Sequence, residues 1–159
     1  MIILGLDPGT TRLGYGIIKT GTGGTKYLSC GVIEPGVKDR TERLKFLHTG
    51  LIKLIKEYKP DAAVVEKLYF SNNKTTALSV AEARGVILLT LAIYNISITE
   101  FTPNEVKKMV AGWGRSDKHG VELAVKISLS LPKDFKVLDD ATDALALALS
   151  GSFMNKTYS

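Results

Sequence analysis

The sequence predicts an α/β protein built on a mixed sheet, with three antiparallel strands first and parallel strands after them. Two short apolar runs, Ile2–Leu6 and Ala62–Val65, have the composition of strands buried on both faces, and each leads directly into a carboxylate, Asp7 or Glu66. After residue 39, runs with the 3.6-residue period of helices alternate with further strand-like runs. This alternation is typical of parallel strands joined through helices.

The three N-terminal strands are expected to form an antiparallel meander. Pro8 and Gly9 force a turn after the first strand, and strands over residues 14–19 and 27–33 follow. The connection between the second and third strands is a loose hairpin, because it contains three glycines, Gly21, Gly23 and Gly24.

The fourth strand covers residues 62–66, and one helix is expected before it in the chain and one after it. The first helix, over 39–58, has apolar residues along one face and Lys and Glu along the other, and residues 59–61 end it. Residues 67–75 are polar and aromatic and are expected to form a mobile connection. The helix over 76–94 is apolar around most of its circumference, which makes it a candidate subunit interface.

The C-terminal part of the chain predicts one strand and three helices. The strand covers 96–101, and Thr102 then opens a capping box with proline at the first helical position. Glycines within 112–115 interrupt this helix, and Ser or Asp at 116–117 caps the next one. The last helix begins near Asp139.

Composition narrows the possible functions. The 159 residues are expected to form one domain, 1–159, and the net charge of +5 favours a polyanionic partner. A single cysteine excludes an internal disulfide and, with two histidines, argues against a Cys/His zinc cluster, so any metal would be held by oxygen. The sequence contains neither a secretory leader nor an apolar window of about 18 residues, so we expect a soluble cytoplasmic protein with no membrane partner.

Four carboxylates are predicted to meet at one edge of the sheet. Asp7 and Glu66 end strands that are expected to be parallel neighbours, whose C-terminal ends lie within side-chain reach of each other. Asp140 and Asp143 lie three residues apart near the start of the last helix and project from one face. Taken alone, this pair is better explained by acids that complement the helix dipole, with Asp139 as an N-cap.

The four acids together predict a metal site. Converging carboxylates repel one another unless divalent cations neutralise them, and a site of carboxylate oxygens suits Mg²⁺ or Mn²⁺. Two such ions can hold the attacking and leaving oxygens of a phosphodiester displacement. With the four acids set apart, 21 basic and 12 acidic side chains remain, a balance of +9 that favours nucleic acid as the partner.

These motifs resemble the RuvC-type Holliday junction resolvases of the ribonuclease H-like superfamily. The resemblance extends over almost the whole chain, and it rests on Gly5–Gly9 with Gly14–Gly16, Glu66 followed by an aromatic residue, Ala83–Gly85, Val106–Lys107, Lys118 and Asp140–Ala146. It implies a five-stranded mixed sheet, three antiparallel strands then two parallel, with helices on both faces.

The resemblance also implies an activity. The protein would be a homodimeric, structure-selective endonuclease that resolves four-way junction DNA in recombination and repair. It would make paired symmetric nicks that leave 5′-phosphate and 3′-hydroxyl ends, using two Mg²⁺ ions per site, with Mn²⁺ as a substitute. An association with the RuvAB branch-migration complex is implied as well.

Residue roles follow from the same resemblance. Asp139 competes with Asp140 for a place in the metal site, because it lies i,i+4 from Asp143, but the family's Asp-x-x-Asp-Ala spacing selects Asp140. Lys107 and Lys118 match basic residues near the scissile phosphate, where an ammonium stabilises charge in the transition state. The catalytic and metal-binding acids would then be Asp7, Glu66, Asp140 and Asp143.

Candidate DNA contacts lie on two loops. Tyr69 and Phe70 could stack on an unpaired base. The family's aromatic three residues after the glutamate selects Tyr69, but either ring could instead anchor the loop. Asn73 and Lys74 could follow the DNA backbone, or belong to a plain solvated loop. Arg12, with the threonines before it, could contact a phosphate or serve only the turn.

Three other functions fit the sequence less well. A YqgF-type resolvase-like nuclease also opens with a strand, Asp and Gly, but Pro8, Lys118 and the acids at the start of the last helix fit it less well. An actin-like ATPase shares the Asp-x-Gly-Thr turn but needs two such domains. A catalytically silent junction-binding module is disfavoured by the complete set of four acids.

Overall fold

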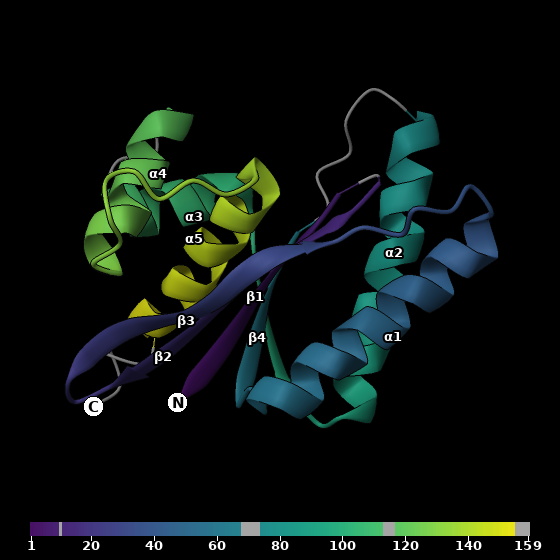
Figure 1. The fold of residues 1–159 in the computed structure, drawn as a ribbon, viewed down its shortest axis with the longest axis horizontal. Coiled ribbons are helices and arrows are strands. Elements are labelled where there is room, and N and C mark those ends of the chain that lie inside the picture. The colour runs from purple at the N-terminus through teal and green to yellow at the C-terminus, as the bar shows by residue number, and fades with distance from the viewer. Residues whose placement is uncertain (10, 68–73, 113–116, 155–159) are drawn as a thin grey trace.

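A five-stranded sheet lies at the centre of the protein (Figure 1). The computed structural model describes residues 1–9, 11–67, 74–112 and 117–154, and the side chains of residues 74–76 are outside this description. The strands are β1 (Ile2–Pro8), β2 (Leu13–Gly21), β3 (Gly24–Ile33), β4 (Ala62–Glu66) and β5 (Ser97–Phe101), in the order β3-β2-β1-β4-β5. The β1–β2 and β2–β3 pairs are antiparallel, whereas β1–β4 and β4–β5 are parallel. The predicted mixed sheet is therefore confirmed.

Helices cover both faces of the sheet, as predicted. On one face α1 (Arg40–Tyr58) and α2 (Lys74–Ile93) bury a core that includes Leu51, Ile87 and Leu91. On the other face α5 (Asp139–Met154) lies on β1 and β2, with α3 (Pro103–Ala111) and α4 (Lys118–Ser128) packed against it. Figure 1 shows the two groups of helices on opposite sides of the twisted sheet. No described helix is long and apolar enough to cross a lipid bilayer.

The predicted helix starts are confirmed by their caps. Asp39 accepts a hydrogen bond from Glu42 N at 2.9 Å, and Thr102 forms the full capping box with Glu105. At the start of α4 Asp117 is the cap, accepting from Gly120 N at 2.8 Å. Each cap satisfies backbone N–H groups that a helix leaves unpaired at its first turn.

Two helix boundaries differ from expectation. Helix α2 begins at Lys74, two residues before the expected start. The apolar period does not mark this start, because the first residues of the helix are polar. Helix α4 ends at Ser128 instead of Leu131. Ser130 adopts a left-handed φ of 52°, which stops the helix before the proline at position 132.

The backbone of α5 approaches β1 and β2 closely. A Cβ atom at Gly5 would lie 2.6 Å from Ala148 N, and one at Gly14 would lie 2.6 Å from the carbonyl carbon of Asp140. Only glycine fits at these two strand positions. The contact holds the first turn of α5 against the end of the sheet where β1 turns into β2.

Candidate active site

Asp7 and Glu66 lie beside each other at the C-terminal edge of the sheet. Leu6 of β1 pairs with Val65 of β4 in parallel register, so the next residue on each strand is a carboxylate. Side chains alternate along a strand, and Ile3 and Val64 point into the α5 side of the core. Asp7 and Glu66 therefore project toward α5, and both are half-buried.

The first turns of α5 add two more acids to this edge. Burial, followed by the charges of Glu66, Asp143 and Asp140, raises the pKa of Asp7 from 3.8 to about 8. Burial first, and then the charge of Asp143, raises the pKa of Glu66. Burial also raises the pKa of Asp143. The structure therefore brings the four acids within electrostatic reach of one another, as the strand topology predicts.

Two lysines face this acidic cluster. Lys118 Nζ lies 2.8 Å from Asp139 Oδ2 and 3.9 Å from Asp143 Oδ2. These contacts, first of all the hydrogen bond to Asp139, raise the pKa of Lys118. Lys107, on α3, lines a cavity of about 220 Å³ together with Glu66, Asp143 and Lys118. The cavity has both carboxylate and ammonium groups on its walls, and it is open to solvent.

Asp139 takes a different position from the other acids of α5. Its side chain is 75% exposed and binds Lys118, and this hydrogen bond lowers the pKa of Asp139. The charge of Asp140, in contrast, is one of the causes that raise the pKa of Asp7. The geometry thus favours Asp140 over Asp139 as the member of the cluster.

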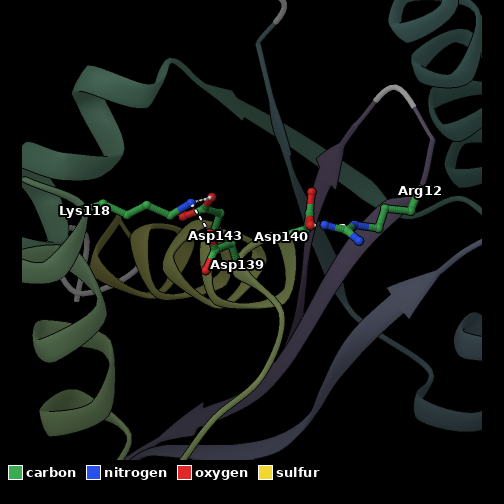
Figure 2. A network of polar contacts seen from close by, with 5 residues as sticks. All are labelled: Arg12, Lys118, Asp139, Asp140 and Asp143. Carbon is green, nitrogen blue, oxygen red and sulfur yellow. Dashed lines mark hydrogen bonds and ion pairs between the residues drawn. The ribbon is translucent and has the colours of Figure 1, made fainter.

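The side chains of Asp140 and Asp143 turn toward different cationic partners. Asp140 Oδ2 accepts a hydrogen bond from Arg12 Nε at 2.7 Å, while Asp143 faces Lys118 (Figure 2). Among the described residues, no three His, Cys, Asp or Glu side chains are gathered closely enough to hold a metal ion. The acids share one electrostatic site, but the ion pairs with Arg12 and Lys118 draw their oxygens apart.

The donor chemistry of the cluster nevertheless fits a hard divalent cation. All its donors are carboxylate oxygens, the ligands that Mg²⁺ and Mn²⁺ prefer. Three of the four acids, Asp7, Glu66 and Asp143, have raised pKa values, so the protein alone does not neutralise their charge. Rotation of Asp140 and Asp143 away from their cationic partners would be needed to gather the oxygens.

The predicted DNA contacts are divided between described and undescribed residues. Tyr69, Phe70 and Asn73 lie outside the described residues. Lys74 is the first residue of α2, and its side chain is outside the description too. Arg12 is described, and its partner is Asp140.

Arg84 makes a contact at this edge that sequence reasoning did not assign. Its Nε donates to the backbone oxygen of Glu66 at 3.4 Å, and its guanidinium forms an ion pair with Glu100 of β5. Arg84 therefore links α2 to the ends of β4 and β5, beneath Glu66. The available signal was that Arg84 is one of few charged residues on a mostly apolar helix.

Comparison with known proteins identifies the family. A family model described as crossover junction endodeoxyribonuclease RuvC matches residues 3–151. The RuvC protein of Alkaliphilus metalliredigens is 45% identical over 160 residues, covering 98% of this chain and 97% of that protein. The RuvC protein of Pseudothermotoga lettingae is 44% identical over 149 residues, covering 93% of this chain and 91% of that protein.

Solved structures agree with the sequence comparisons. Thermus thermophilus RuvC, solved in complex with Holliday junction substrate, matches with a TM-score of 0.91 at 28% identity, covering 99% of this chain and 96% of that one. The yeast mitochondrial Holliday junction resolvase Ydc2 matches with a TM-score of 0.73 at 10% identity, covering 98% and 80%, which shows a likeness of fold alone. These matches confirm the expected ribonuclease H-like fold. The chain belongs to the RuvC family of crossover junction endodeoxyribonucleases.

Proposed function

We propose that this protein resolves Holliday junctions as a metal-dependent endodeoxyribonuclease. The observation that carries the proposal is the cluster of Asp7, Glu66, Asp140 and Asp143 at the C-terminal edge of the sheet, in a chain of the RuvC family. A relative from Thermus thermophilus was solved with a Holliday junction, and we propose four-way junction DNA as the substrate here.

The four acids would hold two Mg²⁺ ions, or Mn²⁺ in their place. When bound, such a pair of ions neutralises the carboxylates, activates the attacking water and stabilises the leaving oxygen of a phosphodiester. Attack of water at phosphorus with departure of the 3′ oxygen would leave the proposed 5′-phosphate and 3′-hydroxyl ends. Half-burial of Asp7 and Glu66 strengthens the attraction between the acids and cations, because less water screens it.

Lys118 and Lys107 would act on the phosphate itself. Lys118 lies 3.9 Å from Asp143 and, like an ordinary lysine, is protonated at neutral pH; its contacts raise its pKa further. An ammonium at this position stabilises negative charge that develops on the phosphoryl oxygens in the transition state. Lys107 lines the same cavity from α3.

A homodimer would place two such sites on one junction. Helix α2 exposes Leu78, Leu89 and Ile93, which are 61%, 62% and 60% exposed and lie on one face of the helix. A Cβ at Gly85 on the same helix would meet nothing within 4 Å, so a second helix could approach there. We propose this α2 face as the dimer contact, and on family membership alone we also propose association with RuvAB in the cytoplasm.

The proposal is tested with a labelled four-way junction and a linear duplex of the same sequence, each incubated in Mg²⁺ and in EDTA. We expect paired nicks in the junction only, in Mg²⁺ only, and none from Asp7→Asn, although this variant still binds the junction. Glu57→Gln, on the exposed surface of α1, is the matched control and should cut normally. Cleavage of the duplex at the same rate, or undiminished cleavage by Asp7→Asn, would refute the assignment.

A further inference from the structure

Arg12 and Asp140 form a partly buried ion pair between the β1–β2 turn and α5. Arg12 Nε lies 2.7 Å from Asp140 Oδ2, and the two side chains are only 32% and 21% exposed. The backbone of Arg12 is fixed as well, because its carbonyl oxygen accepts from Gly9 N at 3.0 Å. A Cβ on Gly9 would lie 3.5 Å from Asp140 Oδ1, so the carboxylate rests against the turn.

The ion pair of Arg12 with Asp140 is shorter than the contact of Lys118 with Asp143. Lys118 is bound more closely by Asp139, at 2.8 Å, than by Asp143, at 3.9 Å. Asp143 therefore has a looser cationic partner than Asp140 has. Asp140 cannot turn its bonded oxygen toward Asp7 without giving up its hydrogen bond to Arg12.

Arg12 also borders a second, basic region. Arg12 lines a small cleft with Arg40 and Arg43 of α1, and the acidic residue among its described lining is Glu82, which pairs with Arg40. Its lining comes from the β1–β2 turn, α1 and α2. Arginine side chains arranged in this way suit the phosphates of a nucleic acid backbone.

We propose that Arg12 exchanges partners between the two regions. In the metal-free protein it neutralises Asp140; when a divalent cation takes Asp140, the released guanidinium binds a backbone phosphate of the DNA in the cleft of Arg40 and Arg43. This inference rests on the proposed function and deepens it. Metal and DNA would each strengthen the binding of the other through one side chain, since such coupling is reciprocal.

The first test measures metal binding without DNA, by calorimetric titration with Mg²⁺ and Mn²⁺. Arg12→Gln removes the competitor for Asp140 and should tighten metal binding about fivefold, the effect of a partly exposed ion pair. Arg12→Lys should fall between this variant and the parent protein. Arg40→Gln is the matched control. It removes the same charge from the same cleft, but Arg40 pairs with Glu82 and not with an acid of the cluster. The metal affinity of this variant should change less than about twofold.

The second test measures junction affinity by fluorescence anisotropy, in EDTA and in Ca²⁺, with gels to verify that the DNA stays intact. Arg12→Gln should bind the junction like the parent protein in EDTA and about fivefold more weakly in Ca²⁺. Circular dichroism confirms that each variant is folded. A merely structural role for Arg12 would lower affinity equally in both buffers.

The outcomes separate this inference from the proposed function. Metal affinity that is unchanged or weaker in Arg12→Gln, or that changes equally in Arg40→Gln, overturns the partner exchange, even if the parent protein cuts junctions. A parent protein that binds no divalent cation overturns it too. Tighter metal binding in Arg12→Gln with the expected loss of junction affinity supports the exchange, even if the parent protein fails to cut.

Discussion

The metal-free protein should lose stability as the pH rises, because of Asp7. Burial and the neighbouring acids raise the pKa of Asp7 from 3.8 to about 8 in the folded protein, whereas the unfolded chain has the ordinary value. Between pH 4 and pH 8 the folded protein therefore keeps a proton that the unfolded chain has released. Under this condition the free energy of unfolding falls as the pH increases.

The magnitude follows from the width of this pH window. About four pH units at about 1.4 kcal/mol each correspond to a loss of about 6 kcal/mol from pH 4 to pH 8. This is a large part of the 5–15 kcal/mol that stabilises an ordinary domain, as an order of magnitude. Asp7→Asn replaces the carboxyl by a neutral amide of the same size. It should unfold like the parent protein at pH 4 and be roughly several kcal/mol more stable at pH 8.

The assay is urea unfolding in EDTA at half-unit steps from pH 4 to pH 8, followed by circular dichroism. Glu57→Gln, an exposed acid of α1, is the control and should follow the parent protein at every pH. Added Mg²⁺ should stabilise the parent protein at pH 8 more than Asp7→Asn, since a ligand of the folded state raises stability. Parent stability that stays level or rises up to pH 8 would refute the reasoning, as would an Asp7→Asn variant that is less stable there.

Three further predictions follow from the described contacts. Lys118→Ala should lower the single-turnover cleavage rate about 100-fold while junction affinity changes little, because the ammonium acts on transition-state charge; an equal loss of affinity would contradict this role. Gly5→Ala should cost about 3 kcal/mol or more in thermal unfolding, because its Cβ would lie 2.6 Å from Ala148 N, whereas Gly21→Ala, with nothing within 4 Å, should be nearly neutral. Leu89→Lys should yield monomers in analytical ultracentrifugation and single instead of paired nicks, and Ile127→Lys, an exposed apolar residue of α4, should leave the dimer intact.

The element order was predictable because each element has a local signal. The strand-end acids stand out against apolar runs, and the caps at Asp39, Thr102 and Asp117 mark helix starts within a few residues of each signal. The meeting of Asp7 with Glu66 then follows from parallel pairing of neighbouring strands. For these features, short stretches of sequence carry the physical cause.

The partners of the acids were not predictable in the same way. Arg12 and Asp140 are 128 residues apart, and nothing local to either residue marks the other. The i,i+3 spacing of Asp140 and Asp143 predicts a shared face, yet their side chains turn toward different cations. Arg84 reaches a backbone oxygen, a partner that every residue offers. Such choices depend on the assembled tertiary structure.

The close contact of α5 with β1 and β2 has a consequence for how the site tolerates change. At Gly5 and Gly14 peptide groups touch peptide groups, so no side chain lies between the helix and the strands. The distance between the backbones that carry Asp7 and Asp140 is therefore set by direct contact between main-chain atoms. Substitutions elsewhere in the core can shift α1 or α2 on the far face without altering this spacing. The geometry of the acidic site therefore does not depend on the volume of the core side chains. Sequences with differently packed cores can keep the same site.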